Sequence, residues 1–250
     1  MKVSVITATY NRGISIERSI NSVKSQDYSN VELVVVDGNS DDDTVSKVEA
    51  LLGINDIFVT EKDNGIYDAL NKGINLSSGD IIGFMHSDDM YADNRVISSV
   101  VDIFNDNDNT NIVYGDACFF SGTSHEKVTR VYRSDSLSLK NLSWGKMPSH
   151  TAMFVRKTVY QKYGLFKTSY RIAGDYEFLC RLMKVAEVNA VYSPALFVKM
   201  QSGGVSTGGL SNTILLNKEV LSACAENGIY TNLFMILSKY PSKLLQFIRK

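Results

Sequence analysis

The stretch Asp80–Asp89, DIIGFMHSDD, is a short apolar run that ends abruptly in two adjacent carboxylates. A run of this length, opened by a Ser-Gly pair and rich in isoleucine and phenylalanine, predicts a buried strand. Ligands of open α/β sheets collect outside the carboxyl ends of the strands. Adjacent carboxylates repel each other unless a positive charge holds them, and a hard divalent cation is the usual partner. The stretch therefore predicts a metal-dependent site at Asp88 and Asp89, unless Asp89 or Asp93 simply caps the next helix.

The residues before this stretch alternate between strand-like and helix-like patterns. Apolar runs predict strands at 3–8, 31–36 and 57–60. Helical stripes of apolar residues follow these runs at 16–23, 45–52 and 66–74. Strands that alternate with helices of this length are typical of βαβ units and a mostly parallel sheet flanked by helices. We therefore expect an α/β fold.

The pattern becomes mixed after Asp89. A helical stripe covers 96–104, and short strands are expected at 112–116 and 151–155. A hairpin is expected to join 119–120 to 127–132, and an amphipathic helix to cover 175–186. A glycine-rich segment at 202–209 precedes two further helical patterns, at 215–225 and 233–248. This second half is expected to shape the pocket of a second ligand.

Composition excludes several classes of protein. The formal net charge of −1 gives no indication of nucleic-acid binding, and a hydrophobic content of 44% supports a sizeable core. Cys118, Cys180 and Cys224 are widely spaced and odd in number, so we expect buried free thiols. The chain opens directly on strand-like residues, and no apolar run approaches the roughly 20 residues that span a bilayer. A cytoplasmic protein is the default expectation.

Polar side chains follow the first two predicted strands. Thr7, Thr9 and Asn11 cluster at the end of the first strand, and Asp37 ends the second. Together they place hydroxyls, an amide and a carboxylate where the base and ribose of a nucleotide can be bound. The sequence contains neither a GxGxxG cradle nor a Walker lysine motif. The phosphates of a bound nucleotide would therefore be neutralised through a metal held by Asp89.

Five segments, in this order, resemble motifs of the family-2 glycosyltransferases, which are inverting enzymes with the GT-A fold. The segments are VSVITATYNR at 3–12, VVVDGNSDD at 34–42, EKDNGIYDALNKG at 61–73, HSDD at 86–89 and AGDYEF at 173–178. Each motif alone is weak, but five in the same order are a strong indication.

The resemblance implies a GT-A catalytic domain over residues 1–205. Its first half, 1–110, would bind the nucleotide sugar, and its second half, 111–205, would bind the acceptor. Residues 206–250 would form a C-terminal helical extension.

The resemblance also implies roles for the donor-side residues. Asp37 would accept a hydrogen bond from the uracil of a UDP-sugar, and Thr9 would line the base and ribose site. Ser87 and Asp88 belong to the donor motif, where Asp88 would contact ribose or sugar hydroxyls. Asp89 would bind Mn²⁺ or Mg²⁺ bridging the diphosphate, which stabilises the charge on the leaving UDP.

Asp175 is the implied general base. It would take the proton from the acceptor hydroxyl as that oxygen attacks the anomeric carbon in line and inverts its configuration. The alternative is a helix N-cap, because Gly174-Asp175 also suits the start of a helix.

Five further donor-side candidates come from the third motif. Asp63, Asn64 and Gly65 are expected to form a donor-site loop, although Asp-Asn-Gly is also an ordinary turn. Asp68 is expected to contact the nucleotide, or else to favour the helix dipole. Lys72 would reach a phosphate or the base pocket, or else lie in solvent.

Two residues are candidates for the acceptor side. His150 precedes a predicted strand and would face the acceptor, with a structural histidine as the alternative. Trp144 would stack on a sugar ring, with ordinary packing as the alternative.

The chain lacks the Gln-x-x-Arg-Trp motif of processive polysaccharide synthases, so transfer of a single sugar is expected. The segment at 202–206 resembles a loop of bacterial members that build surface polysaccharides such as O-antigen, capsule or exopolysaccharide. Their usual acceptor is a saccharide on polyprenyl diphosphate at the cytoplasmic face of the inner membrane. The basic amphipathic tail, 230–250, would then lie on the membrane surface, or else pack on its own domain. Two other functions stay open, a nucleotidyltransferase and a non-catalytic sugar- or nucleotide-binding module.

Overall fold

The computed structural model of the chain describes residues 1–121, 128–134, 137–185, 187–202 and 209–238. Several predicted features lie outside these residues. They are the turn of the hairpin at 122–127, the end of the helix at 186, most of the glycine-rich segment at 203–208, and the tail at 239–250.

Four parallel strands form the first half of the sheet. They are β1 (Val3–Thr9), β2 (Val31–Asp37), β3 (Ile57–Thr60) and β4 (Ile81–Phe84), in the spatial order β3-β2-β1-β4. The connections between them run through α1 (Ile16–Lys24), α2 (Thr44–Leu51) and α3 (Ile66–Leu76). The α/β expectation for this half is confirmed, with each helix close to its predicted position.

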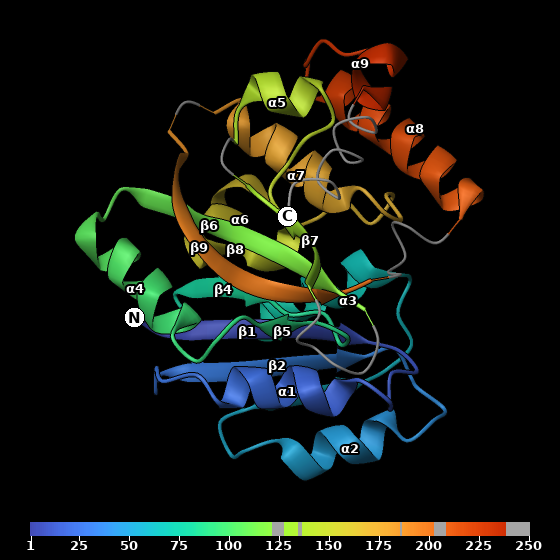
Figure 1. The fold of residues 1–250 in the computed structure, drawn as a ribbon. Coiled ribbons are helices and arrows are strands. Elements are labelled where there is room, and N and C mark those ends of the chain that lie inside the picture. Colours follow the sequence, from blue (N-terminus) through green and yellow to red (C-terminus); the bar gives the residue numbers. More distant parts are fainter. Residues whose placement is uncertain (122–127, 135–136, 186, 203–208, 239–250) are drawn as a thin grey trace.

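The second half of the sheet is mixed. Its strands are β5 (Met90–Tyr91), β6 (Thr110–Phe120), β7 (Val128–Tyr132), β8 (Met153–Arg156) and β9 (Asn189–Gln201). The sheet continues from β4 in the order β8-β6-β9-β5, and β7 pairs with β6 as the predicted hairpin requires. β8 is antiparallel to both β4 and β6, whereas β6 and β9 are parallel. Figure 1 shows the long strands β6 and β9 curving beside each other.

The remaining helices belong to the second half as well. They are α4 (Val96–Asp106), α5 (Leu139–Ser143), the short 3₁₀ helix η1 (His150–Ala152), α6 (Lys157–Tyr163), α7 (Gly174–Met183), α8 (Leu210–Glu226) and α9 (Leu233–Leu237). The predicted stripes at 96–104, 175–186 and 215–225 correspond to α4, α7 and α8. None of the described helices combines the length and hydropathy needed to cross a bilayer.

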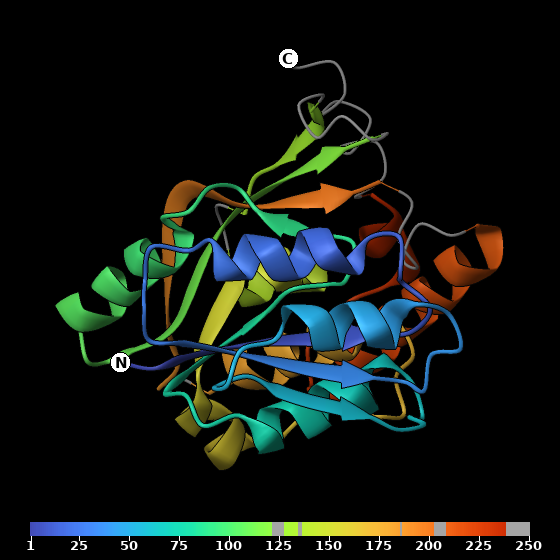
Figure 2. The same ribbon diagram turned by 90° about the horizontal axis from the view of Figure 1, so that it is seen from below.

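Alternation along the strands divides the core between the two faces of the sheet. In β1, Val3 and Val5 point to one face and Ile6 to the other, as expected from the two-residue period of a strand. The first face is covered by α1, α2 and α4, and the second by α3, α6, α7 and α8. Figure 2 shows α1 and α2 together on the first face.

Helix α8 belongs to the same hydrophobic core as α7. Its Val220, Ala223 and Cys224 are buried in one cluster with Tyr176 and Cys180 of α7. The Tyr176 hydroxyl lies 3.3 Å from the Cys224 sulfur. All three cysteines are free and buried, as expected from their spacing.

Candidate active site

The carboxyl ends of β1, β2 and β3 bring the predicted base-binding residues together. Register places Thr9 beside Asp37, and Asp37 beside Thr60. Within the described part of the chain, the buried hydroxyls of Thr7 and Thr9 have no hydrogen-bond partner. A buried hydroxyl left unpaired costs about 1–3 kcal/mol. Thr9, which lies at the sheet edge, is therefore suited to bonding a ligand there.

Asp37 is fully buried and already oriented by its neighbours. Its Oδ2 accepts from the Ser40 N–H at 2.9 Å and from the Thr60 hydroxyl at 2.8 Å, and its Oδ1 accepts from the Ser40 hydroxyl. An ionised carboxylate offers about four acceptor positions. Three are used here, which leaves about one acceptor position of Asp37 unused.

Asn11 joins the loops that follow β1 and β2. Its N–H donates to the Ser40 hydroxyl at 2.8 Å, and its side-chain oxygen accepts from the Asp41 N–H at 3.0 Å. Asn11 and Asn39 both have positive φ, 51° and 66°, which asparagine tolerates better than most residues. In this structure Asn11 therefore holds together the two loops that follow the carboxyl ends of β1 and β2.

The predicted donor loop packs against the loop that follows Asp37. Asp63 accepts from the Gly65 N–H at 2.8 Å. Its Oδ2 lies so close to Gly38 that a Cβ there would approach it to 2.7 Å. Gly65 has φ of 112°, a conformation that favours glycine, and directly precedes α3. The structure therefore brings Asp37 and Asp63 to one place.

Asp68 and Lys72 lie on α3 and contact each other. Asp68 accepts from the Asn64 N–H at 2.9 Å, which closes the donor loop onto the helix. The Lys72 ammonium lies 2.8 Å from Glu61 and 3.6 Å from Asp68. These ion pairs engage both residues, and their contact with a nucleotide stays a prediction.

The acidic pair follows β4, whose chain continues with a bond from the Met85 N–H to the Ile6 carbonyl. Asp89 is buried, and its Oδ1 accepts from the Gln201 N–H at 3.0 Å at the end of β9. The backbone oxygen of Asp88 accepts from Arg18 at 2.6 Å. Ser87 is buried beside them. Because α4 begins only at residue 96, Asp89 is not its cap.

Electrostatics at this pair favours a cation. Burial, and next the charge of Asp88, raises the pKa of Asp89 well above its usual value, and Arg18 acts in the opposite direction. Neither carboxylate forms a salt bridge within the described ranges. The described residues also contain no cluster of three His, Cys, Asp or Glu side chains able to close a metal site. Mg²⁺ usually binds one or two carboxylates and completes its shell with phosphates and water. The pair fits such a shared cation.

Asp175 lies in the first turn of α7. Its Oδ1 accepts from the Tyr67 hydroxyl at 3.0 Å and from the Tyr176 N–H at 2.9 Å. Burial is the main cause that raises the pKa of Asp175 to about 6. The N-cap position belongs to Ala173, so Asp175 is not the cap. A carboxyl with this pKa is suited to general-base catalysis near neutral pH.

The comparison with known proteins agrees with this geometry. Residues 4–164 match the glycosyl transferase family 2. The chain is a family-2 glycosyltransferase.

Relatives of this glycosyltransferase cover most of its length. A PGL/p-HBAD biosynthesis glycosyltransferase of Mycobacterium bovis (strain BCG / Pasteur 1173P2) is 28% identical over 87% of this chain and 82% of its own. An uncharacterized glycosyltransferase of Mycobacterium tuberculosis (strain CDC 1551 / Oshkosh) is 31% identical over 74% of this chain and 70% of its own.

Solved structures share the GT-A fold. TarS 1–349 of S. aureus in complex with UDP-GlcNAc has a TM-score of 0.68 at 17% identity, covering 89% of this chain and 66% of that chain. The mannosyltransferase PcManGT of Pyrobaculum calidifontis, in complex with GDP-Man and Mn²⁺, has a TM-score of 0.62 at 18% identity, covering 98% and 80%. The expected fold class is thus confirmed.

The two acceptor-side candidates of this glycosyltransferase, His150 and Trp144, lie in different surroundings. His150 is 9% exposed and stacks on Phe84 with ring centroids 4.5 Å apart. Burial, with a smaller effect of His86, lowers the pKa of His150 to about 3. Trp144 directly follows α5 and is half-buried. Contact of either residue with an acceptor stays a prediction.

Tyr67 contacts the candidate base and Glu219 contacts the loop before it, and the sequence did not single out either residue. Tyr67 could have been predicted from the sequence, because it lies inside the third motif on which the family resemblance rests. The single O–H of Tyr67 is shared between Asp175 and the Ile172 carbonyl, whose oxygen lies 2.7 Å from the hydroxyl. Gly174 lies so close that a Cβ there would approach the Tyr67 ring to 2.8 Å. Helix α3 therefore begins at the donor loop and contacts the candidate base from its first turn.

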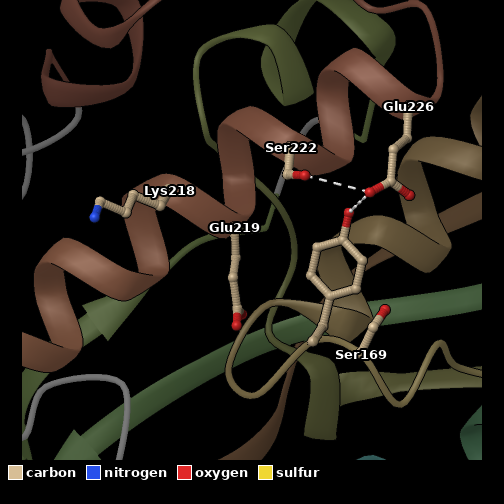
Figure 3. A pocket seen from close by; sticks show the side chains of 6 residues that line it. Ser169, Lys218, Glu219, Ser222 and Glu226 are labelled. Carbon is tan, nitrogen blue, oxygen red and sulfur yellow. Dashed lines mark hydrogen bonds between the residues drawn. The ribbon is translucent and has the colours of Figure 1, made fainter.

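A cavity of about 310 Å³ lies between α8 and the loop before α7. It is lined by Ser169, Tyr170, Lys218, Glu219, Ser222 and Glu226 (Figure 3). None of the predicted donor residues lines it. Glu219 had no sequence signal, because nothing local in α8 marks its contact with a loop that precedes it by more than 40 residues.

Proposed function

We propose that this glycosyltransferase transfers one sugar from a UDP-sugar to a saccharide acceptor, with inversion and with the help of a divalent cation. The observation that carries the proposal is Asp175, a half-buried carboxyl in the first turn of α7 that accepts a hydrogen bond from Tyr67 and has its pKa raised to about 6, mainly by burial. It contacts α3, the helix that starts at the donor loop. The complexes of TarS with UDP-GlcNAc and of PcManGT with GDP-Man and Mn²⁺ support a nucleotide-sugar donor and a cation.

On the donor side, the chain would hold the nucleotide through the carboxyl edge of the sheet. Asp37 would use its remaining acceptor position for an N–H of the uracil, and Thr9 would bond the base or ribose. Asp88 would contact ribose or sugar hydroxyls. A cation held by Asp89 would supply counter-charge for the leaving diphosphate.

On the acceptor side, Asp175 would accept a proton at Oδ2. Both hydrogen bonds that orient the carboxylate, from Tyr67 and from the Tyr176 N–H, are made to Oδ1. The acceptor hydroxyl would donate its proton to Oδ2 while its oxygen attacks the anomeric carbon from the side opposite UDP. A single displacement of this kind inverts the configuration.

UDP release tests the proposal, assayed with a panel of UDP-sugars, p-nitrophenyl glycosides as acceptors, and Mn²⁺ or EDTA. We expect release with Mn²⁺ and its loss with EDTA. Asp89→Ala should lower the rate about 100-fold or more and weaken UDP binding, since the diphosphate loses its counter-charge. Asp93→Ala is the matched control, because among the described residues the Asp93 side chain accepts from the Arg95 N–H before α4 and forms no hydrogen bond with Asp88 or Asp89. Tight UDP binding without release from any donor would favour the binding module instead, and pyrophosphate-forming chemistry a nucleotidyltransferase.

We further propose that the acceptor is a polyprenyl-diphosphate-linked saccharide of surface polysaccharide synthesis, at the cytoplasmic face of the inner membrane. Residues 230–250 would contact that membrane. Their described part supports this, because Tyr230 and Phe234 are each 78% exposed and Leu233 is 53% exposed.

Vesicle sedimentation tests the membrane contact. The full chain should sediment with vesicles containing anionic phosphatidylglycerol, and Leu233→Ser/Phe234→Ser should reduce the bound fraction several-fold. Leu210→Ser, at an 83% exposed residue of α8, is the control. Equal sedimentation of both variants would assign the tail to packing.

A further inference from the structure

The backbone that leads into α7 is held by one side chain from α8. Glu219 accepts from the Arg171 N–H at 2.8 Å through Oε1, and from the Ile172 and Ala173 N–H groups at 2.9 and 2.8 Å through Oε2. Hydrogen bonds to an ionised group are about twice as strong as neutral ones. Three of them on consecutive peptides fix the orientation of the segment that directly precedes Gly174 and Asp175.

The same segment is held from the opposite direction. The Ile172 carbonyl accepts from Tyr67 on α3, while the Ile172 N–H donates to Glu219 on α8. The ring of Tyr67 also packs where Gly174 lacks a side chain. Asp175 therefore starts α7 between two helices that each bond the residues before it.

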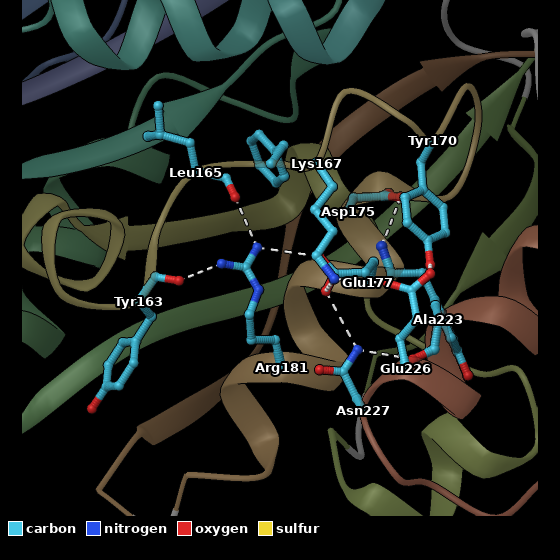
Figure 4. A network of polar contacts seen from close by, with 12 residues as sticks. Tyr163, Leu165, Lys167, Tyr170, Asp175, Glu177, Arg181, Ala223, Glu226 and Asn227 are labelled. Atoms are coloured by element: carbon cyan, nitrogen blue, oxygen red, sulfur yellow. Dashed lines mark hydrogen bonds and ion pairs between the residues drawn. The ribbon is translucent and has the colours of Figure 1, made fainter.

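Neighbouring side chains of α8 and α7 hold the earlier part of this loop. Lys167 lies 2.7 Å from Glu226 and 3.0 Å from Glu177, which is fully buried, and the Tyr170 hydroxyl donates to Glu226 at 2.8 Å (Figure 4). These contacts do not reach residues 171–173. In Figure 3 the Glu219 carboxylate points toward the loop, whereas Lys218 points away from it. Among these side chains of α8, Glu219 is therefore the one that bonds residues 171–173.

We propose that Glu219 is a positioning residue for Asp175: it holds the backbone at 171–173 so that the Asp175 carboxyl meets the acceptor hydroxyl. This inference rests on the proposed role of Asp175 as general base. Glu219 lies beyond residues 4–164, which match the family. It makes a helix of the C-terminal extension part of the catalytic arrangement.

The charge of Glu219 gives the proposal a second signature. Besides burial, which is the main cause, the negative charge of Glu219 contributes to the raised pKa of Asp175. The described titratable groups that interact with Asp175 are Tyr67 on α3, Tyr132 on β7 and Glu219. Removing the Glu219 charge should therefore lower the pKa of Asp175. The acid limb of the pH–rate profile should move to lower pH.

Glu219→Gln and Glu226→Gln form a matched pair. Each removes one carboxylate charge from α8 at nearly constant size, but Glu226 does not bond residues 171–173. Both are assayed by UDP release with the preferred donor and p-nitrophenyl glycoside of the panel. Glu219→Gln should lower kcat about 10- to 100-fold, as expected for a misplaced catalytic group, with UDP binding unchanged and the acid limb shifted to lower pH. Glu226→Gln should leave the acid limb in place.

Glu219→Asp keeps the negative charge, but its shorter side chain moves the carboxylate away from the N–H groups of residues 171–173. This variant replaces Glu219→Gln as the test if Glu219→Gln does not fold. It should lower kcat while the acid limb stays close to that of the wild type. Wild-type kcat in Glu219→Asp, or an equal acid-limb shift in Glu226→Gln, would overturn the proposal. Asp175→Asn distinguishes a failure of the proposed function from a failure of the positioning role of Glu219. If Asp175→Asn still transfers sugar, the proposed function fails; if it does not, yet Glu219→Gln matches the wild type, only the positioning role fails.

Discussion

Thr9 shows how a single side chain indicates a ligand at the residue scale. Its hydroxyl is buried at the carboxyl end of β1 without a partner in the described structure, beside the oriented carboxylate of Asp37. Such a group destabilises the free protein unless a ligand bonds it. Function and stability should therefore change in opposite directions when it is removed.

Thr9→Val tests this opposition, because valine keeps the shape and removes the hydroxyl. The free energy of unfolding without ligand should rise by about 1 kcal/mol, and the affinity for UDP should fall several-fold. Urea unfolding and calorimetric titration with UDP measure the two quantities. Thr110→Val is the control, since its hydroxyl is also buried and has no partner among the described residues, but lies at the start of β6 and belongs to none of the predicted site residues. Equal loss of UDP affinity in both variants would contradict the role given to Thr9.

Asp175 carries a comparable conflict between charge and burial. Its pKa in the folded chain is about 6, above the ordinary 3.8. Between these values the folded chain binds more protons than the unfolded chain, so stability falls as pH rises from about 4 to about 6. The ionised carboxylate that works as a base is thus the less stable form of the folded protein.

Asp175→Asn should remove both the activity and this pH dependence. Transfer should fall about 10²- to 10⁴-fold with UDP binding retained, because only deprotonation of the acceptor is lost. Above pH 7 the variant should be more stable than the wild type by at most about 3 kcal/mol, and below pH 4 the difference should vanish. Urea unfolding across this range measures it. Parallel stability curves for the two proteins would refute the assigned pKa.

At the scale of elements, local pattern predicted the strands and helices whose apolar residues follow one period. The runs that became β1, β2 and β4 alternate between two buried faces, and α1, α3 and α4 have one buried stripe each. Strand β9 escaped prediction because Pro194 interrupts it. The pairing of β9 with β6 shifts in register between Tyr114 and Asp116, at the point where Pro194 lies in β9. Proline is tolerated at such an irregularity, and pairing with β6 resumes beyond it, so β9 continues as one strand.

The candidate site also divides into residues that a local sequence motif indicates and residues that only tertiary packing indicates. Asp37, Asp89 and Asp175 belong to short motifs that a sequence displays directly. Glu219 does not, because its function depends on how α8 packs across α7, and that packing involves contacts between residues far apart in the chain. The sequence therefore displays the candidate reacting groups, whereas the side chain that contacts the backbone before one of them is evident only from the structure.

At the scale of the whole molecule, the boundary expected at residue 205 separates residues that share one core. Beyond it, α8, α9 and the turn between them bury five side chains in the cluster that includes α7: Val220, Ala223, Cys224, Ile229 and Ile236. Fully burying a valine or isoleucine contributes about 1.5–3 kcal/mol. The two isoleucines and the valine together therefore approach the entire stability of an ordinary domain, about 5–15 kcal/mol.

A chain ending at residue 205 should accordingly lose its cooperative unfolding transition, although it keeps every predicted donor and base residue. A chain ending at residue 238 retains α8 and α9 and should unfold cooperatively, with a Tm close to that of the full protein. Thermal unfolding followed by circular dichroism, together with UDP release, compares the two. If the shorter chain folded and transferred sugar at the full rate, neither the shared core nor the contact between Glu219 and residues 171–173 would be needed for catalysis. If it folded but lost transfer while still binding UDP, the donor half would be independent, and α8 would serve the acceptor half alone.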